Sequence, residues 1–245
     1  MAEVIGRQPG DPIKIAILIP THEKVDALWA YDLAQLTMLT TATMPENEGH
    51  SISVLMMTST YIHKARQELL QEAIRIGSTH VLWLDSDMRF PADALLRLLQ
   101  RNVPVVGINY SKRRLPPEFV AIKRIPREDD DPQDGEVLHT NEDSEGLEEV
   151  DILGFGCVLM EVATLVNLPD PQYDPWFMFG KTSHGADIGE DAWFCIKMLQ
   201  DVCNTKIFVD HDLSKDCAHI GPFEFKPYHA EATEAARAEL AETEE

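Results

Sequence analysis

Short apolar runs that alternate with helical segments constrain the fold of this chain more than any other feature. The runs are rich in aliphatic and β-branched residues, and the segments between them have the spacing of amphipathic helices. Strands are expected at IKIAILIP (13–20), SISVLMMTST (51–60), HVLWLD (80–85) and VPVVGINYS (103–111). Strands that alternate with helices predict an α/β fold, with a mixed, mainly parallel sheet flanked by helices.

The second half of the chain is less regular. A polar, acidic stretch precedes an expected buried strand in VDILGFGCVLMEV, a helix in GEDAWFCIKMLQDV and a last strand in TKIFVDHDL. We therefore expect one folded domain with three additions. The expected parts are an N-terminal extension (1–12), the domain itself (13–228), an acidic loop insertion within it (128–149) and an acidic Ala/Glu-rich C-terminal helix or tail (229–245).

The net charge of −21 comes mostly from two segments. Residues 128–151 and 230–245 hold 18 of the 42 acids and one of the 21 Lys and Arg residues, which leaves 24 acids and 20 bases elsewhere. The acidity disfavours nonspecific binding to nucleic acid without excluding a local basic groove. The densest basic run, YSKRRLPPEFVAIKRIPR (110–127), predicts a strand pair with surface salt bridges, which we favour, or a phosphate-binding track.

The sequence shows no sign of a membrane or an oxidising compartment. No apolar run approaches the roughly 20 residues of a membrane helix. The first residues, MAEVIGRQPGDP, lack the basic and then apolar pattern of a signal peptide. The four cysteines form no CxxC pair, so we expect reduced thiols in a cytoplasmic protein with no membrane partner.

In the run HVLWLDSDMRFP, an expected buried strand ends on two carboxylates. Asp85 and Asp87 would lie at the carboxyl tip of this strand, where open α/β sheets bind ligands. Like charges so close together repel unless a cation lies beside them. A divalent metal with oxygen ligands, accompanied by a phosphate, would meet that need. The simpler alternative is that Asp and Ser cap the next helix, although one aspartate would suffice for a cap.

Four motifs follow one another along the chain: DSD after a strand, LGFG on a later strand, GEDAWF at a helix start and AHIG near the end. Their order resembles that of family 2-like glycosyltransferases of the glycosyltransferase-A fold, including short phage and bacterial members. HKARQELLQEA and GINYSKRR are similar to that family's ARN helix and Y-x-K-R strand exit, although Gln67 replaces the ARN asparagine. Over roughly residues 13–222, the resemblance implies a Rossmann-like fold that transfers a sugar from a nucleotide-sugar to a hydroxyl group.

The resemblance also implies a metal-dependent, inverting reaction. Mg²⁺ or Mn²⁺ would stabilise the charge on the leaving nucleoside diphosphate. We expect Asp87 to bind the metal, Asp85 to lie beside it or nearer the ribose, and His219 to be a third ligand, although a lone His is often structural. Glu190 and Asp191 begin a helix, where acids suit the helix dipole in any protein. Because the resembled family uses the aspartate of this pair as general base, we expect Asp191, with Glu190 as the alternative, to deprotonate the acceptor.

Five further residues are candidate contacts to the donor. Thr21 and Glu23 follow the first strand, where the resembled family grips the nucleotide base. Arg66, Lys112 and Arg113 are candidate phosphate contacts, since Arg binds phosphate in a bidentate way and Lys as a point charge. Each of these three could equally be a solvated surface cation.

Glycines and aromatic residues mark two more candidate contact regions. Gly154 and Gly156 would permit close approach of donor or acceptor to their strand, or would form a simple bulge. Trp176 and Phe177, in an expected flexible loop before the base, would stack on a sugar or acceptor ring or belong to the core.

Rival functions remain open. A haloacid-dehalogenase-like phosphatase also uses DxD after a strand, but its motif lies on the first strand and has Thr or Val where this chain has Arg89. A binding module or virion component without catalysis is a second alternative. A zinc site is disfavoured because the candidate ligands Cys203, His211, Cys217 and His219 match no structural zinc spacing. The expected partners are a nucleotide-sugar, uridine-based from the resemblance alone, and a soluble hydroxyl acceptor such as a glycan, a small polyol or a hydroxymethylated base of phage DNA.

Overall fold

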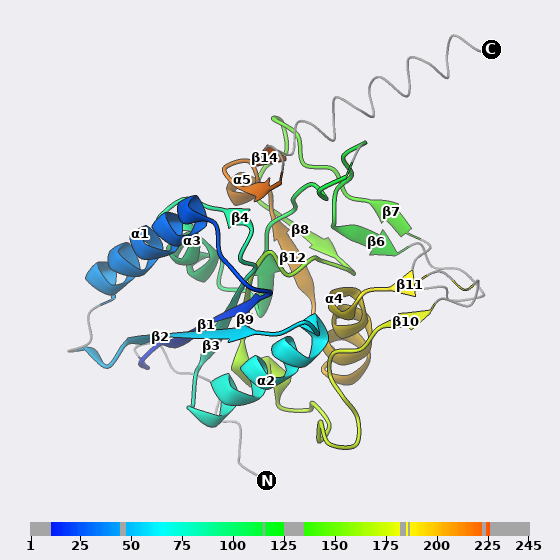
Figure 1. The fold of residues 1–245 in the computed structure, drawn as a ribbon, viewed down its shortest axis with the longest axis horizontal. Coiled ribbons are helices and arrows are strands. Elements are labelled where there is room, and N and C mark those ends of the chain that lie inside the picture. The colour runs from blue at the N-terminus through cyan, green and yellow to red at the C-terminus, as the bar shows by residue number, and fades with distance from the viewer. Residues whose placement is uncertain are drawn as a thin grey trace.

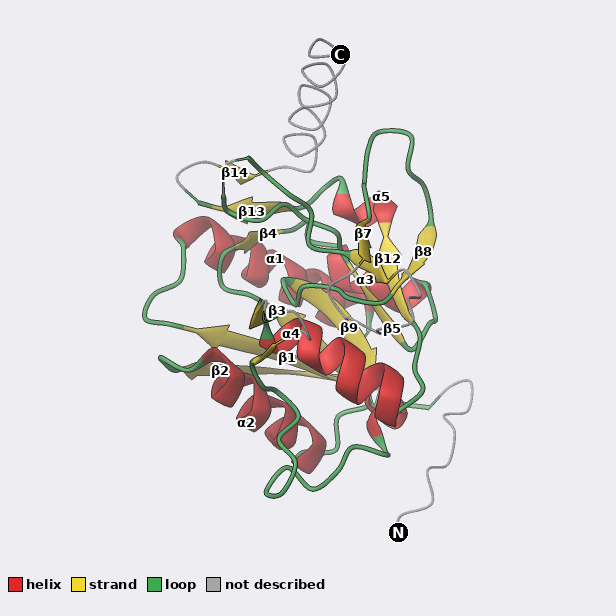
Figure 2. Ribbon diagram, turned by 90° about the vertical axis from the view of Figure 1, so that its right-hand side faces the viewer, coloured by secondary structure: helices red, strands yellow, loops and turns green. Residues whose placement is uncertain are grey.

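Seven strands form the central sheet, and helices cover both of its faces (Figures 1 and 2). The structure, a computed structural model of the chain, describes residues 11–44, 48–114, 116–124, 135–181, 185, 187–221 and 224–225. In spatial order the strands are β2 (Ser51–Thr58), β1 (Lys14–Thr21), β3 (His80–Leu84), β9 (Cys157–Glu161), β5 (Val105–Gly107), β12 (Ile207–Asp210) and β8 (Leu147–Val150). Only β8 and β9 run against the other five, so the mixed, mainly parallel sheet that the sequence predicts is confirmed.

The remaining elements are short, apart from two long helices. The helices are α1 (Ala27–Thr43), α2 (Ile62–Arg75), α3 (Ala94–Gln100), α4 (Glu190–Trp193) and α5 (His211–Ser214), with a 3-10 turn η2 (Val162–Leu165) and a π-helical segment η3 (Phe194–Val202) that continues α4. There are also three small sheets among the described residues. In the first, β13 (Ala218–Ile220) pairs with both β4 (Met88–Arg89) and β14 (Glu224–Phe225). In the others, β6 (Ile122–Arg124) pairs with β7 (Gly135–Val137), and β10 (Gly180–Lys181) pairs with β11 (Asp187–Ile188).

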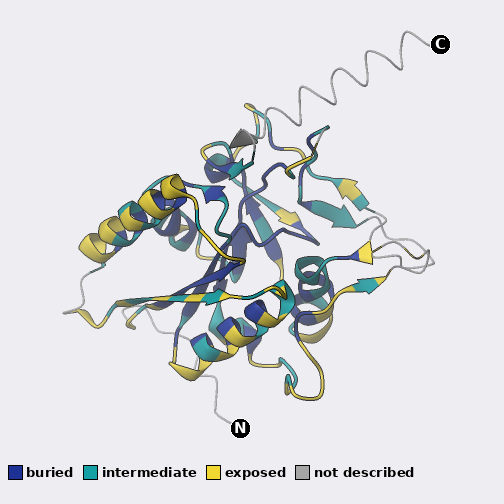
Figure 3. Cartoon of the chain, viewed as in Figure 1, coloured by how far each residue is buried: buried dark blue, intermediate teal, exposed yellow. Residues whose placement is uncertain are grey.

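The core has one buried cluster on each face of the sheet. Leu69 and Leu70 of α2 pack with Phe194 of η3 against one face. Trp29 of α1 and Leu95 of α3 pack against the other. Strand β1 lies between these layers and is buried from its second residue to its last, whereas the edge strand β2 is buried less (Figure 3). Helices on both faces explain why β1 is a continuous apolar run and not an alternating one.

An aromatic cluster fills the space between the sheet and η3. Phe177 stacks on Phe194, with ring centroids 4.4 Å apart, and meets Trp83 and Phe155 edge-on. Of the two alternatives for Trp176 and Phe177, the structure shows core packing, because both side chains are buried.

The expected additions to the domain fall largely outside the described residues. Residues 1–10, 125–134 and 226–245 are not described, so the extension, much of the acidic insertion and the tail stay predictions. The described part of the insertion contains β7 and most of β8. All four cysteines are free. Among the described residues, no helix has the length and apolar character needed to cross a membrane.

The aromatic cluster predicts a contrast between two neighbouring phenylalanines. Phe177 is 1% exposed and Phe179 is 57% exposed. Phe177→Ala should lower the free energy of unfolding by about 3–5 kcal/mol, because it leaves a cavity in the core. Phe179→Ala should change it by less than about 0.5 kcal/mol. Urea denaturation followed by circular dichroism measures both, and equal losses would contradict the assignment of Phe177 to the core.

Candidate functional site

Backbone contacts join each aspartate of the DSD motif to a segment that is distant in sequence. Asp85 and Asp87 lie in the turn between β3 and β4, where the Asp85 N–H donates to the Gly156 carbonyl (3.0 Å). Strand β4 pairs with β13 so that Met88 lies opposite His219. The Ile220 N–H also donates to the Asp87 carbonyl (2.6 Å). This pairing places His219, which is 132 residues later in the sequence, beside Asp87.

A recess of about 360 Å³ lies at the carboxyl ends of β1, β2 and β3. It brings together eight of the twelve candidate site residues: Thr21, Arg66, Asp85, Asp87, Arg113, Glu190, Asp191 and His219. Sequence reasoning missed other lining residues, which follow β1 and β2 or lie within the DSD motif: His22, Ser59, Thr60 and Ser86. Their positions after apolar strands were the available signal.

The guanidinium of Arg66 links two halves of the recess. Its side chain is 3% exposed and lies over the rings of Trp83 and Phe155. One Nη donates to both carboxylate oxygens of Asp85 (3.0 and 3.3 Å), and Nε donates to Glu190 (3.2 Å). Burial opposes the charge of Arg66, but the nearby carboxylates outweigh it and raise its pKa. Arg66 therefore binds carboxylates of the protein in this arrangement.

The two aspartates of the DSD motif have pKa shifts in opposite directions. Burial raises the pKa of Asp85 to about 6, against the lowering effect of Arg66. Burial also works to raise the pKa of Asp87. When the His219 ring carries protons on both nitrogens, its hydrogen bond and charge, with the charge of Arg113, outweigh burial, so the net shift is downward. Asp87 is thus the more strongly ionised of the two and the better candidate to bind a cation.

His219 presents a defined nitrogen to Asp87. Its Nδ1 lies 3.0 Å from the Ser111 carbonyl, which only accepts hydrogen bonds, so Nδ1 carries a proton. Nε2 lies 3.4 Å from Oδ2 of Asp87, and in a neutral ring this nitrogen carries a lone pair. Two acceptors face each other unless the ring is protonated or a cation binds both. The same Oδ2 also forms an ion pair with the guanidinium of Arg113 (3.0 Å).

Asp87 and His219 fit a small divalent ion as a pair of ligands. Oδ2 of Asp87 and Nε2 of His219 lie 3.4 Å apart, so one ion would be able to contact both. Within the described ranges, no group of three His, Cys, Asp or Glu side chains forms a metal cage. Such a pair suits an ion that takes its other ligands from phosphate and water, as Mg²⁺ commonly does.

The two acids at the start of α4 also differ in their hydrogen-bond partners. Glu190 is committed to Arg66, whereas Asp191 accepts a hydrogen bond from the Ala192 N–H (2.7 Å) and lines the recess. Burial and the neighbouring charge of Glu190 raise the pKa of Asp191, and Arg66 partly opposes the shift. A carboxylate with a raised pKa in a recess suits proton transfer.

The two glycines of LGFG make room for a tyrosine. A Cβ on Gly154 would lie 2.6 Å from the Tyr110 hydroxyl, and one on Gly156 would lie 2.7 Å from its ring. Tyr110 meets the His219 ring edge-on (5.2 Å), and burial raises its pKa well above the usual value. Tyr110, from the quoted GINYSKRR run, therefore supports the recess from below, and the glycines do not line it in this structure.

Two expected donor contacts, Glu23 and Lys112, do not line the recess. Glu23 is exposed, and Lys112 lies 3.8 Å from Glu118. The other cations of the basic run also meet acids: Arg114 pairs with Glu118, Lys123 with Glu148 and Arg124 with Asp151. Arg127 lies outside the described residues. Strand β6 pairs with β7 as the salt-bridge alternative expects.

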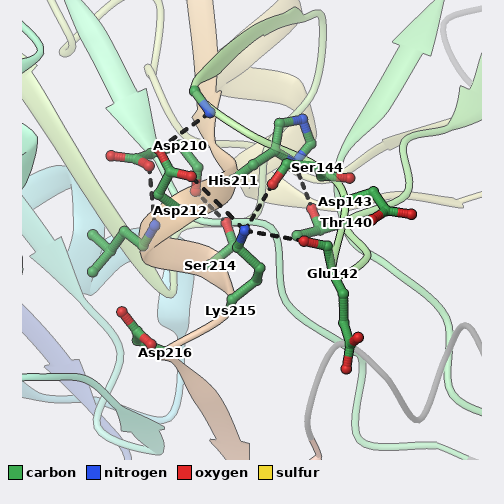
Figure 4. Close-up of polar contacts among 12 residues, drawn as sticks. Thr140, Glu142, Asp143, Ser144, Asp210, His211, Asp212, Ser214, Lys215 and Asp216 are labelled. Carbon is green, nitrogen blue, oxygen red and sulfur yellow. Dashed lines mark hydrogen bonds and ion pairs between the residues drawn. The ribbon is translucent and has the colours of Figure 1, made fainter.

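A second polar cluster joins α5 to residues 138–148 (Figure 4). His211 lies 2.9 Å from both Thr140 and Glu148, an arrangement that could suggest a nucleophile and a base. Thr140 is fully buried, however, and its hydroxyl accepts a hydrogen bond from Asn109 (3.1 Å). Lys215 donates to the Ser144 carbonyl (2.8 Å). The cluster therefore holds this segment against the sheet, and the Thr140 hydroxyl is not a reachable nucleophile.

Comparisons with known proteins bear on the fold. The chain matches no protein-family model and no curated protein. It is similar to the crystal structure of A197 from STIV, with a TM-score of 0.54 and 14% identity over 89% of this chain and 91% of that one. At this identity the likeness concerns the fold alone. The expected glycosyltransferase-A-like sheet flanked by helices is confirmed.

Removal of the buried guanidinium predicts a large loss of stability. Arg66→Met should lower the free energy of unfolding by about 3 kcal/mol, because it leaves two partly buried carboxylates without their partner. The matched control is Arg75→Met on the same helix, where an exposed pair with Glu72 should contribute little. Urea denaturation in chelator compares the two, and equal effects would show that Arg66 does not link the halves of the recess.

Proposed function

We propose that this protein is a metal-dependent glycosyltransferase that moves a sugar from a nucleotide-sugar to an acceptor hydroxyl with inversion. The observation that carries the proposal is the convergence of Asp85, Asp87, Asp191 and His219 on one recess at the carboxyl ends of the strands. These residues come from three distant segments, and capping of a helix does not require them to meet.

In the proposed donor site, charged residues of the recess would bind a metal ion and the phosphates of the donor. Asp87 and His219 would hold Mn²⁺ or Mg²⁺, with Asp85 beside them. When bound, the ion supplies Lewis-acid stabilisation of the charge on the leaving nucleoside diphosphate. Arg113 is half exposed and would move from Asp87 to a phosphate oxygen when the donor binds.

Residues at and just after the carboxyl end of β1 would bind the nucleoside. Thr21 has a buried hydroxyl without a hydrogen-bond partner among the described residues, which leaves it available for the donor. Glu23 is exposed nearby in sequence and would reach the donor only after a shift of its loop. A uridine base rests on the resemblance alone, and thermal shifts with UDP-, GDP-, CDP- and TDP-sugars would identify it.

Asp191 would act as the general base. It removes the proton of the acceptor hydroxyl while that oxygen bonds to the anomeric carbon. The bond from the anomeric carbon to the phosphate oxygen breaks on the opposite side, and its electron pair leaves with the nucleoside diphosphate. Glu190 is held by Arg66 and would keep the base in position.

The acceptor is proposed as a soluble hydroxyl compound. The ion pairs of Lys112, Arg114, Lys123 and Arg124 leave this run less suited to DNA phosphates than its composition suggests. A glycan or a small polyol therefore fits better than a modified DNA base.

A binding module without catalysis is the second candidate. Asp85 and Asp87 already have cationic partners in Arg66 and Arg113, an arrangement that needs no metal. Release of nucleoside diphosphate from a nucleotide-sugar, measured over many turnovers, separates the two candidates.

Donor binding is expected to depend on the metal. Calorimetry should show tighter binding of UDP with Mn²⁺ than with chelator, and Asp87→Ala should abolish the difference. Asp143→Ala, which changes an exposed acid in another region, should leave it unchanged. Equal affinity of the unaltered protein in both conditions would refute the metal-bridged site.

Transfer is expected to require ionised Asp191. Because the pKa of Asp191 is raised, its ionised fraction falls as pH decreases, at a higher pH than the usual Asp value of about 3.9. The kcat of the unaltered protein should therefore decline on acidification with a midpoint above that value.

Asp191→Asn should lower kcat by about 10²-fold or more and remove this decline. Donor affinity, measured by calorimetry, should stay nearly unchanged. If Glu190→Gln abolishes transfer while Asp191→Asn does not, the roles of the two acids are reversed.

A further inference from the structure

The outer face of α1 carries no charge. Among its 17 residues the only Asp, Glu, Lys or Arg is Asp32, which is buried and paired with Arg89 (2.5 Å). Exposed helices of soluble proteins normally present charged residues to water. In a chain of net charge −21, this face is a place where a second copy can approach without like-charge repulsion between the contacting side chains.

Figure 3 shows that one side of α1 is exposed. Part of that side has the residue spacing of a heptad pattern. Residues at spacings of three, four, three and four form one stripe, which consists of Leu28, Tyr31, Gln35, Met38 and Ala42. Tyr31 and Met38 are 62% and 67% exposed. These spacings are those of the a and d positions through which helices pair in coiled coils.

The stripe matches itself when one copy is turned end to end. In an antiparallel pair, a positions meet d positions, so Leu28 lies opposite Met38 of the second copy, and Tyr31 lies opposite Gln35. Each contact then occurs twice, as a two-fold axis requires. A second copy of the chain therefore supplies the matching stripe, and a different protein is not required.

A recess beside the stripe gives the pair a place to interlock. It has a volume of about 370 Å³ and is lined by Tyr31, Asp32 and Gln35 of α1, by residues 89–92 before α3, and by Asp216. Its charged groups are paired within the chain, Asp32 with Arg89 and Asp216 with Arg97. In the antiparallel register, Tyr31 of one copy faces Gln35 of the other and enters this recess, as a knob enters a hole. We propose that α1 is the contact surface of a symmetric homodimer.

Charge substitutions test both the dimer and its register. Light scattering after gel filtration should give twice 27.6 kDa for the unaltered chain. Leu28→Lys and Met38→Glu should each reduce the mass to that of one chain, and the double variant should restore the dimer through two Lys–Glu pairs. The two positions are about 15 Å apart along one helix, so they cannot pair within a copy. Met56→Glu, at an exposed methionine on β2, is the control and should remain dimeric.

Three results would overturn the proposal. The unaltered chain could be monomeric at all concentrations, or it could remain dimeric with Met38→Glu, which would place the contact elsewhere. A monomer that becomes a dimer when residues 229–245 are deleted would show that this segment covers α1 in the full chain. Circular dichroism confirms that each variant is folded.

Discussion

One buried cation connects the parts of the candidate site. Arg66 projects from α2 between the DSD turn and the start of α4, and it binds a carboxylate of each. A buried guanidinium is tolerated only with such partners, and the carboxylates in turn need it. The mutual requirement holds together two segments that are more than 100 residues apart in sequence. It also explains why Asp85 and Glu190 are held by the guanidinium, whereas Asp87 and Asp191, which line the same recess, make no hydrogen bond to it.

In the proposed donor site, one cation would replace another on Asp87. Arg113 and His219 approach the same oxygen of Asp87, and the Ser111 carbonyl sets which imidazole nitrogen faces that oxygen. An arginine on an exposed side chain can leave as a divalent ion arrives, while the imidazole stays. The negative charge of Asp87 is then compensated both with and without a ligand. Inner-face contacts of α1 brace the same turn, since Trp29 donates to the Asp85 carbonyl (2.8 Å).

Local pattern and residue type were enough to predict much of this molecule. The apolar runs predicted the parallel strands, and acids after a strand predicted the position of the candidate site. Sequence alone could not show that β8 and β9 run in reverse, because strand direction depends on pairing. Nor could the sequence show that Phe177 is buried and Phe179 exposed. That difference depends on which side chains the folded chain turns toward the core. Arg66 illustrates the same limit: its type suggested a phosphate contact, but its partners are set by the tertiary fold.

The position of His219 depends on backbone pairing between β4 and β13. In such a ladder, side chains alternate between the two faces, and a shift of one residue turns each of them to the opposite face. Replacement of an exposed residue that leads into β13, such as Asp216, would leave the imidazole where it is. Insertion or deletion of a single residue there would direct Ala218 or Ile220 toward Asp87 instead. The number of residues in this connection therefore matters for the position of His219 in addition to the identity of its buried residues.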